Sequence, residues 1–272
     1  MDGCQDRLKI EMSEFNQLLN IVSIIFGLPW SIIILYCLVR LALWKPEIKD
    51  YNYVPKTSVV VAAWKEGKRL VDTINSLLKQ DYPKGKIKLI VVGGGDEETI
   101  NICRKFKKEG KIKFIEERTR GGKWKALNTG VELSDGEIIA FTDADCIVSR
   151  QWLRKLNANL KSKDVYGVVG NVISTGKGYI NKAMDALFPI FTIFPMFVNA
   201  PFFCGQSSAF KYKVFKKIKF RDSIVEDLLL TFEMRTAKMK MLFEKDAITI
   251  HRYPLTTSGF VNAAMRLYVG AY

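Results

Sequence analysis

The chain has 272 residues, of which 26% are charged and 12% aromatic, and its formal net charge is +14. This composition excludes global disorder and allows one large domain with a sizeable core. The five cysteines form no CxxC pair and the only histidine is His251, which excludes a disulfide framework or a cysteine-based zinc site and fits a reducing compartment. A bound metal would therefore depend on carboxylates, which favours Mg²⁺ or Mn²⁺.

An uncharged run at residues 20–39 dominates the first segment. As a helix of about 30 Å it is long enough to cross a bilayer core. We therefore expect a transmembrane helix over residues 18–43 after an extracytoplasmic tail at 1–17, with a hydrophobic core helix as the alternative. Lysine and arginine are more frequent after the run than before it, which places the bulk of the protein in the cytoplasm by the positive-inside rule.

The basic residues are spread over many segments, with no base-stacking motif beside them. We therefore expect no nucleic-acid partner. Anionic lipid at a cytoplasmic membrane face accounts for the charge at least as well. A negatively charged diphosphate substrate would also be attracted by it.

Between residues 57 and 145, short apolar runs alternate with helical patterns. We predict strands over 57–64, 86–95, 111–117 and 137–145, with a helix after each of the first three. This alternation indicates βαβ units, and hence a mostly parallel sheet covered by helices. In such sheets ligands bind at the carboxyl ends of the strands.

Two carboxylates, Asp143 and Asp145, lie at the end of the fourth predicted strand. They lie on the rim where a ligand is expected, and they repel each other unless a cation lies between them. A divalent metal that joins them to a diphosphate would give each charge a partner.

The second half of the chain, from Trp152, is less regular. Its most apolar stretch, residues 179–204, contains Asp185 and three prolines, so a second membrane crossing is not expected. An interfacial segment at the lipid headgroups fits this pattern, and a buried core segment is the alternative.

Six segments occur in a recognisable order: VVVAAWKEG, TINSLLKQDYP, GGKWKALNTG, GEIIAFTDADC, FFCGQSSAFK and VEDLLLTFEM. Together they resemble the family 2 glycosyltransferases, which are inverting enzymes with a GT-A fold. The resemblance covers about residues 57–270. It implies an α/β GT-A domain at 57–272, with a nucleotide-binding half at 57–150 and an acceptor half at 151–272.

The resemblance implies transfer of a sugar from a nucleotide-diphosphate donor, most commonly UDP-linked, to a lipid or glycan acceptor at the membrane. It makes Asp227 the general base, and Asp145 with Asp143 the site for Mg²⁺ or Mn²⁺. The residues that it implies for nucleotide and substrate binding are Glu66, Asp96, Lys123, Asn128, Asp143, Gly205, Glu226 and Arg266.

The nucleotide half departs from the family pattern at the end of the second strand. The family usually has an acidic residue there that contacts the base, whereas this chain has Gly93 and Gly94. Asp96 follows and would either substitute for that acid or cap the next helix. His251 ends a predicted strand, where we favour a structural role over a diphosphate contact.

The acceptor half departs near the end of the chain. The QxxRW motif of processive and lipid-modifying members reads AAMRL here, so Arg266 is kept while Ala263 and Leu267 replace the glutamine and tryptophan. Arg266 would pair with a phosphate or lie on a helix surface. Two alternative functions stay open: a fragment of a chitin-, hyaluronan- or cellulose-type synthase, and a catalytically inactive sugar-nucleotide-binding relative.

Overall fold

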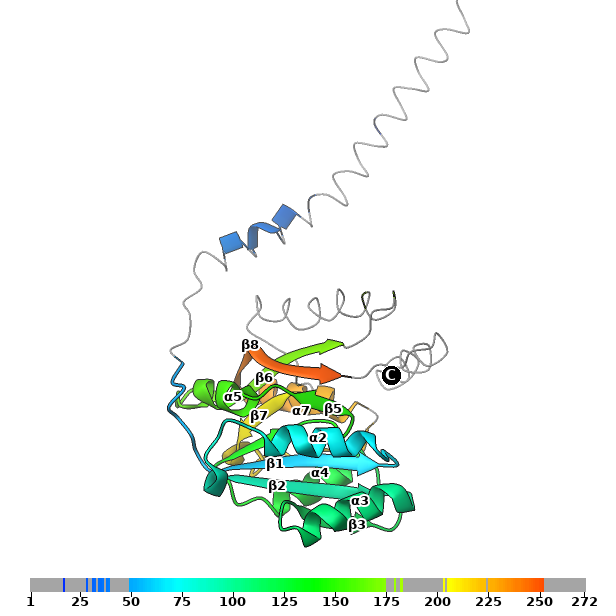
Figure 1. Ribbon diagram of the computed structural model, residues 1–272. Helices are drawn as coiled ribbons and strands as arrows, with labels where there is room; N and C mark the ends of the chain where they lie inside the picture. The colour runs from blue at the N-terminus through cyan, green and yellow to red at the C-terminus, as the bar shows by residue number, and fades with distance from the viewer. Residues whose placement is uncertain are drawn as a thin grey trace, which may run out of the picture. The chain divides into compact units, whose positions relative to one another are not determined.

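The structure, a computed structural model, describes residues 49–174, 203, 205–223 and 225–251, with isolated positions elsewhere (Figure 1). The chain divides into two units, Met1–Pro46 and Glu47–Tyr272. Among the residues that the structure describes, no helix is both long and apolar enough to cross a membrane. The predicted transmembrane helix lies mostly outside the described residues, as do Arg266 and nearly all of 179–204.

The second unit is built on an eight-stranded mixed sheet with the order β3-β2-β1-β4-β7-β6-β8-β5. The strands are β1 (Thr57–Trp64), β2 (Ile87–Gly94), β3 (Lys113–Glu117), β4 (Ile138–Phe141), β5 (Cys146–Val148), β6 (Val165–Ser174), β7 (Ser208–Lys211) and β8 (Lys240–His251). Strands β3, β2, β1 and β4 are parallel, as the βαβ pattern predicts. The second half adds antiparallel pairs at β4–β7, β6–β7 and β5–β8.

Helices cover both faces of this sheet (Figure 1). They are α2 (Arg69–Leu78), α3 (Glu97–Lys108), α4 (Lys123–Glu132), α5 (Trp152–Leu160) and α7 (Glu226–Thr236), with short 3₁₀ turns η1 (Lys84–Lys86) and η2 (Tyr212–Val214). Apolar residues of α2, α3 and α5 form one core cluster, and those of α4 and α7 form the other. We call these sides the α2 face and the α4 face.

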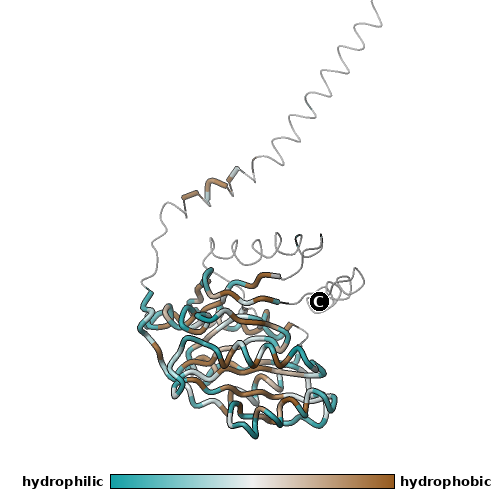
Figure 2. The backbone as a smooth tube through the Cα atoms, viewed as in Figure 1, coloured by the Kyte–Doolittle hydropathy of each residue, from teal (hydrophilic) through white to brown (hydrophobic). Residues whose placement is uncertain are grey.

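Successive strand residues alternate between the two faces, as a pleated strand requires. In β1, Val59 and Val61 join the core of the α2 face, whereas Val60 joins that of the α4 face. Figure 2 shows the result as apolar strands in the interior of the domain with more polar segments outside. The alternation decides which terminal side chains share a face at the carboxyl edge of the sheet.

A group of phenylalanines lies beneath the carboxyl end of β4. The Phe141 ring centre lies 5.4 to 6.1 Å from the ring centres of Phe203, Phe210, Phe215 and Phe220, in edge-on or tilted arrangements that aromatic rings favour. These rings come from segments on both sides of residues 175–202, so they join β4 to the acceptor half. The end of β4, which precedes the acidic pair, is therefore fixed by packing of Phe141 against these four rings.

Candidate active site

Asp143 and Asp145 lie in the turn between β4 and β5, at the carboxyl edge of the parallel strands. Both side chains are about one quarter exposed, at 24%. The Thr73 hydroxyl, on α2, donates a 2.7 Å hydrogen bond to the carbonyl of Ala144 between them. The turn is thus fixed to a neighbouring helix, and the two carboxylates lie where the strand pattern predicts them.

Lys123, the first residue of α4, joins this turn to the acceptor half. Its Nζ lies 2.7 Å from Asp143 Oδ1 and 3.2 Å from Glu226 Oε1, at the start of α7. Burial favours the neutral amine, but the charges of Asp143 and Glu226 outweigh it and raise the pKa of Lys123. A Cβ at Gly205 would lie 3.0 Å from this Nζ, so a larger residue there would crowd the lysine.

Asp227 follows Glu226 in the first turn of α7. Burial, together with the charge of Glu226, raises the pKa of Asp227 to about 6, although the charge of Lys123 partly offsets this. The backbone N–H of Leu228 donates a 2.8 Å hydrogen bond to Asp227 Oδ1. A half-buried carboxylate with a pKa close to neutral is well suited to accept a proton during a reaction.

Glu66 lies in the loop after β1, near Asp143 and Asp145. We call the five carboxylates of this region the acidic cluster: Glu66, Asp143, Asp145, Glu226 and Asp227. Burial raises the pKa of Glu66 to about 7, and the charges of Asp145 and Asp143 add to the shift. The Thr99 hydroxyl, at the start of α3, accepts hydrogen bonds from the backbone N–H groups of Glu66 at 3.0 Å and Gly67 at 2.9 Å. The loop that carries Glu66 is therefore held by α3.

Asp96 is the N-cap of α3: its Oδ1 accepts a 2.8 Å hydrogen bond from the backbone N–H of Thr99. This hydrogen bond lowers the pKa of Asp96. Of the two roles considered from the sequence, the structure has the helix cap, and a contact to a nucleotide stays a prediction. Through Thr99, Asp96 also supports the Glu66 loop.

Asn128, on α4, binds the backbone of the acceptor half. Its Nδ2 donates to the carbonyl of Phe220 at 2.8 Å, and its Oδ1 accepts from the N–H of the same residue at 3.1 Å. Both ends of the amide are occupied by this bidentate contact. The contact positions the segment that leads into α7, and the substrate contact implied by the family motif stays a prediction.

Replacing Asn128 with Ala should lower the free energy of unfolding by about 1–3 kcal/mol, because the buried backbone groups of Phe220 lose both partners. Chemical denaturation measures this. Asn101→Ala, at an exposed position of α3, is the matched control, with a change of about 0.5 kcal/mol or less. Unchanged stability together with weakened nucleotide binding would contradict the structural role.

His251 is a site residue for which sequence reasoning favoured a structural role. Its Nε2 lies 3.2 Å from Asp145 Oδ2, because β8 pairs with β5 so that His251 is opposite Cys146. Burial opposes ionisation of Asp145, but the hydrogen bond and charge of His251 lower its pKa overall. The ligand atoms of Asp145, Cys146 and His251 lie within 4.8 Å of one another, so these side chains could hold a divalent cation.

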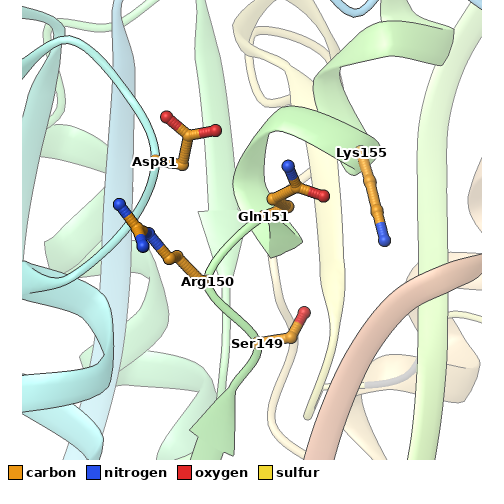
Figure 3. A pocket seen from close by; sticks show the side chains of 5 residues that line it. All are labelled: Asp81, Ser149, Arg150, Gln151 and Lys155. Carbon is orange, nitrogen blue, oxygen red and sulfur yellow. The ribbon is translucent and has the colours of Figure 1, made fainter.

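Two hollows lie away from this cluster, beside the loop after β5. The smaller, of about 320 Å³, is shown in Figure 3 and is lined by Asp81, Ser149, Arg150, Gln151 and Lys155. The larger, of about 660 Å³, lies along α2 and shares Arg150. Neither hollow is lined by a carboxylate of the acidic cluster. We therefore identify the candidate active site from the charges and hydrogen bonds that converge there, and not from the size of a cavity.

A parallel half-sheet with an acidic turn at its carboxyl edge, completed by antiparallel strands and a second acidic pair on a helix, is a GT-A-like α/β fold. The family model described as "Glycosyl transferase family 2" matches residues 58–219. The chain belongs to this family.

Three similar proteins illustrate the range of relatives. The glycosyltransferase GlyG of Streptococcus pneumoniae is 27% identical over 227 residues, which are 78% of this chain and 69% of that protein. The mannosyltransferase PcManGT of Pyrobaculum calidifontis, solved with GDP-Man and Mn²⁺, has a TM-score of 0.72 at 22% identity over 93% of this chain and 72% of its own. TarS of S. aureus, residues 1–349, solved with UDP-GlcNAc, has a TM-score of 0.57 at 18% identity over 75% and 60%.

The two structural likenesses concern the fold alone. The chain spans 40%, 69% and 58% of the lengths of the first three curated relatives that it matches.

Proposed function

We propose that this protein moves a sugar from a nucleotide-diphosphate donor to an acceptor hydroxyl, with inversion at the anomeric carbon. One observation carries the proposal: Lys123 lies between Asp143, on the donor half, and Glu226, next to Asp227 on the acceptor half. Groups suited to leaving-group and nucleophile chemistry thus converge from both halves. Membership of the family supports the same reaction class.

The donor side would hold a divalent cation. Asp145 and His251, with Asp143 nearby, offer carboxylate and imidazole donors that already converge, and this set fits Mn²⁺ or Mg²⁺. When bound, such a cation neutralises the charge that gathers on a leaving diphosphate. Mn²⁺ accompanies the donor in the PcManGT structure, which supports Mn²⁺ as the first cation to test.

The protein's own groups divide the remaining work. Asp227 takes the proton from the acceptor hydroxyl during attack, from the side opposite the departing diphosphate. Lys123 keeps a positive charge beside Asp143 that also favours a phosphate nearby. Glu66 and Asp143 would orient the nucleoside. Arg266, outside the described residues, stays a proposed phosphate partner.

The acceptor is proposed to be a lipid or a lipid-linked glycan at the cytoplasmic membrane face. The uncharged run at 20–39 and the basic residues after it support a membrane anchor of this orientation. A site beside the bilayer would give a lipid hydroxyl direct access to Asp227. The sugar would then be transferred to an acceptor that is held in the membrane.

The test is an assay of the full chain in membranes with a panel of labelled nucleotide sugars, with Mn²⁺, with Mg²⁺ and with a chelator. We expect cation-dependent label in the lipid fraction. Label in a long polymer would favour the polysaccharide synthase. Nucleotide binding without transfer from any donor would favour the inactive relative.

A further inference from the structure

Three residues end adjacent parallel strands in one row at the carboxyl edge. Trp64 of β1 is in register with Gly94 of β2, and Gly94 is in register with Glu117 of β3. The three residues of the row also share a face of the sheet. Val60, Val92 and Ile115 pack on the α4 face. Each lies an even number of residues before the end of its strand, so strand alternation brings Trp64, Gly94 and Glu117 to the α4 face as well.

The middle of this row can only be glycine. A Cβ at Gly94 would lie 2.4 Å from the backbone oxygen of Glu117, and one at Gly95 would lie 2.7 Å from the Trp64 indole. The indole therefore lies over the end of β2. Since neighbouring strands are about 4.8 Å apart, the backbones of Trp64 and Glu117 lie about 10 Å apart, and the indole covers part of the side-chain-free strand end between them. We call this arrangement the Trp64–Glu117 slot.

The Glu117 side chain makes no interaction that stabilises the described part of the fold. Its side chain is half-buried, and within the described part of the chain its carboxylate forms no hydrogen bond or ion pair. Burial raises the pKa of Glu117, and the charge of Lys125 on α4 only partly offsets this. By contrast, its neighbour Glu116 faces the other way and pairs with Arg104 at 2.9 Å. Asp96, the other acid at this edge, is already used as a helix cap.

We propose that the Trp64–Glu117 slot receives the nucleobase of the donor and that Glu117 selects guanine. The inference rests on the proposed transferase function and specifies its donor as a GDP-sugar in place of the UDP-sugar expected from the family. The chain has Gly93 and Gly94 where the family usually has an acidic residue, and Glu117 would supply that carboxylate from the next strand.

The selection follows from hydrogen-bond chemistry. A carboxylate has two acceptor oxygens and no donor, and guanine offers two adjacent donors, its N1–H and its N2 amino group, so the pair is bidentate and charge-assisted. Uracil offers a single N–H between two carbonyls, which repel the carboxylate. Adenine and cytosine place an acceptor beside their amino group. Stacking on Trp64 helps every base alike, because each has a π-face.

The test is calorimetric titration of the purified full chain with GDP, UDP, ADP and CDP, each with Mn²⁺. We expect GDP to bind tightest, by about tenfold or more over UDP, as one good bidentate pair provides. In Glu117→Gln one acceptor becomes a donor, and the GDP-to-UDP ratio should fall to about one. The ratio is measured within each preparation, so partial unfolding does not change it.

Two further variants complete the design. Glu116→Gln, on the adjacent residue that faces away, should keep the wild-type ratio. Trp64→Ala should weaken all four nucleotides by about tenfold or more while preserving their order. Tighter binding of UDP than GDP, or an unchanged ratio in Glu117→Gln, would overturn guanine selection and leave the transferase proposal standing. Failure of all four nucleotides to bind would overturn both.

Discussion

Replacing Asp227 with Asn should lower sugar transfer by about 100- to 10,000-fold, the range over which a general base contributes. The amide keeps the size of the side chain but cannot accept the acceptor's proton. Stability should not fall, because the pKa of Asp227 is raised by burial of its charge. The ionised carboxylate therefore destabilises the folded state above the usual aspartate pKa, and the neutral amide removes that effect.

The same group predicts the pH dependence of the wild type. Transfer should rise with pH through about 6, as Asp227 loses its proton, and then level off. The charged groups that face it are Glu226, Lys123 and Asp143; Glu226 and Asp143 raise its pKa, and Lys123 lowers it. Single-turnover transfer, measured on both sides of that pH, tests the profile, and the rise should be absent from the residual activity of the variant.

Glu233→Gln is the matched control for Asp227→Asn. Glu233 lies on the same helix but pairs with the exposed Arg221, so transfer should stay within about twofold of the wild type, as surface changes usually allow. A rate for Asp227→Asn above about a tenth of the wild-type rate would exclude this aspartate as the base.

Local pattern was sufficient for the nucleotide half of the fold. The apolar runs that form β1, β2 and β4 are buried on both faces of the sheet. Such strands appear as continuous apolar runs, so they can be recognised in the sequence before their pairing partners are known. The predicted fourth strand extended to 145, whereas β4 ends at Phe141. After Phe141 the chain turns, and the N–H of Cys146 donates a hydrogen bond to the carbonyl of Asp143. The Thr142 hydroxyl donates a 2.9 Å hydrogen bond to the carbonyl of Gln206, a contact that no local pattern encodes.

The position of the acidic turn was predictable because one segment carries both Asp143 and Asp145 at the end of a strand. The contacts of the site were not predictable where distant segments meet. His251 reaches Asp145 only because β8 pairs antiparallel with β5, and Lys123 reaches Glu226 only because α4 and α7 share a face. Asn128 shows that a family motif can also suggest a role that local structure does not reveal. The motif implies a substrate contact, whereas in the structure both ends of the amide are hydrogen-bonded to the backbone of Phe220.

Replacing Asp145 with Asn should have the other large effect, on the cation. The substitution removes a negative charge and a strong oxygen donor, so Mn²⁺ should no longer strengthen nucleotide diphosphate binding, and transfer should fall by about 100- to 1,000-fold. His251→Gln should weaken Mn²⁺ by about 10- to 100-fold, since the residue either binds the cation or orients Asp145. Titration of Mn²⁺ by electron paramagnetic resonance, with and without nucleotide, measures both effects.

The control for this pair is Asp81→Asn, which removes a carboxylate that faces Arg154 instead of the cluster. It should leave both Mn²⁺ binding and transfer unchanged, which separates a local charge effect from the general loss of one negative charge in a basic protein. Wild-type Mn²⁺ affinity in Asp145→Asn would mean that the cation is held elsewhere. The contact between His251 and Asp145 would then serve only to join β8 to the turn before β5, and His251→Gln would lower stability without changing Mn²⁺ binding.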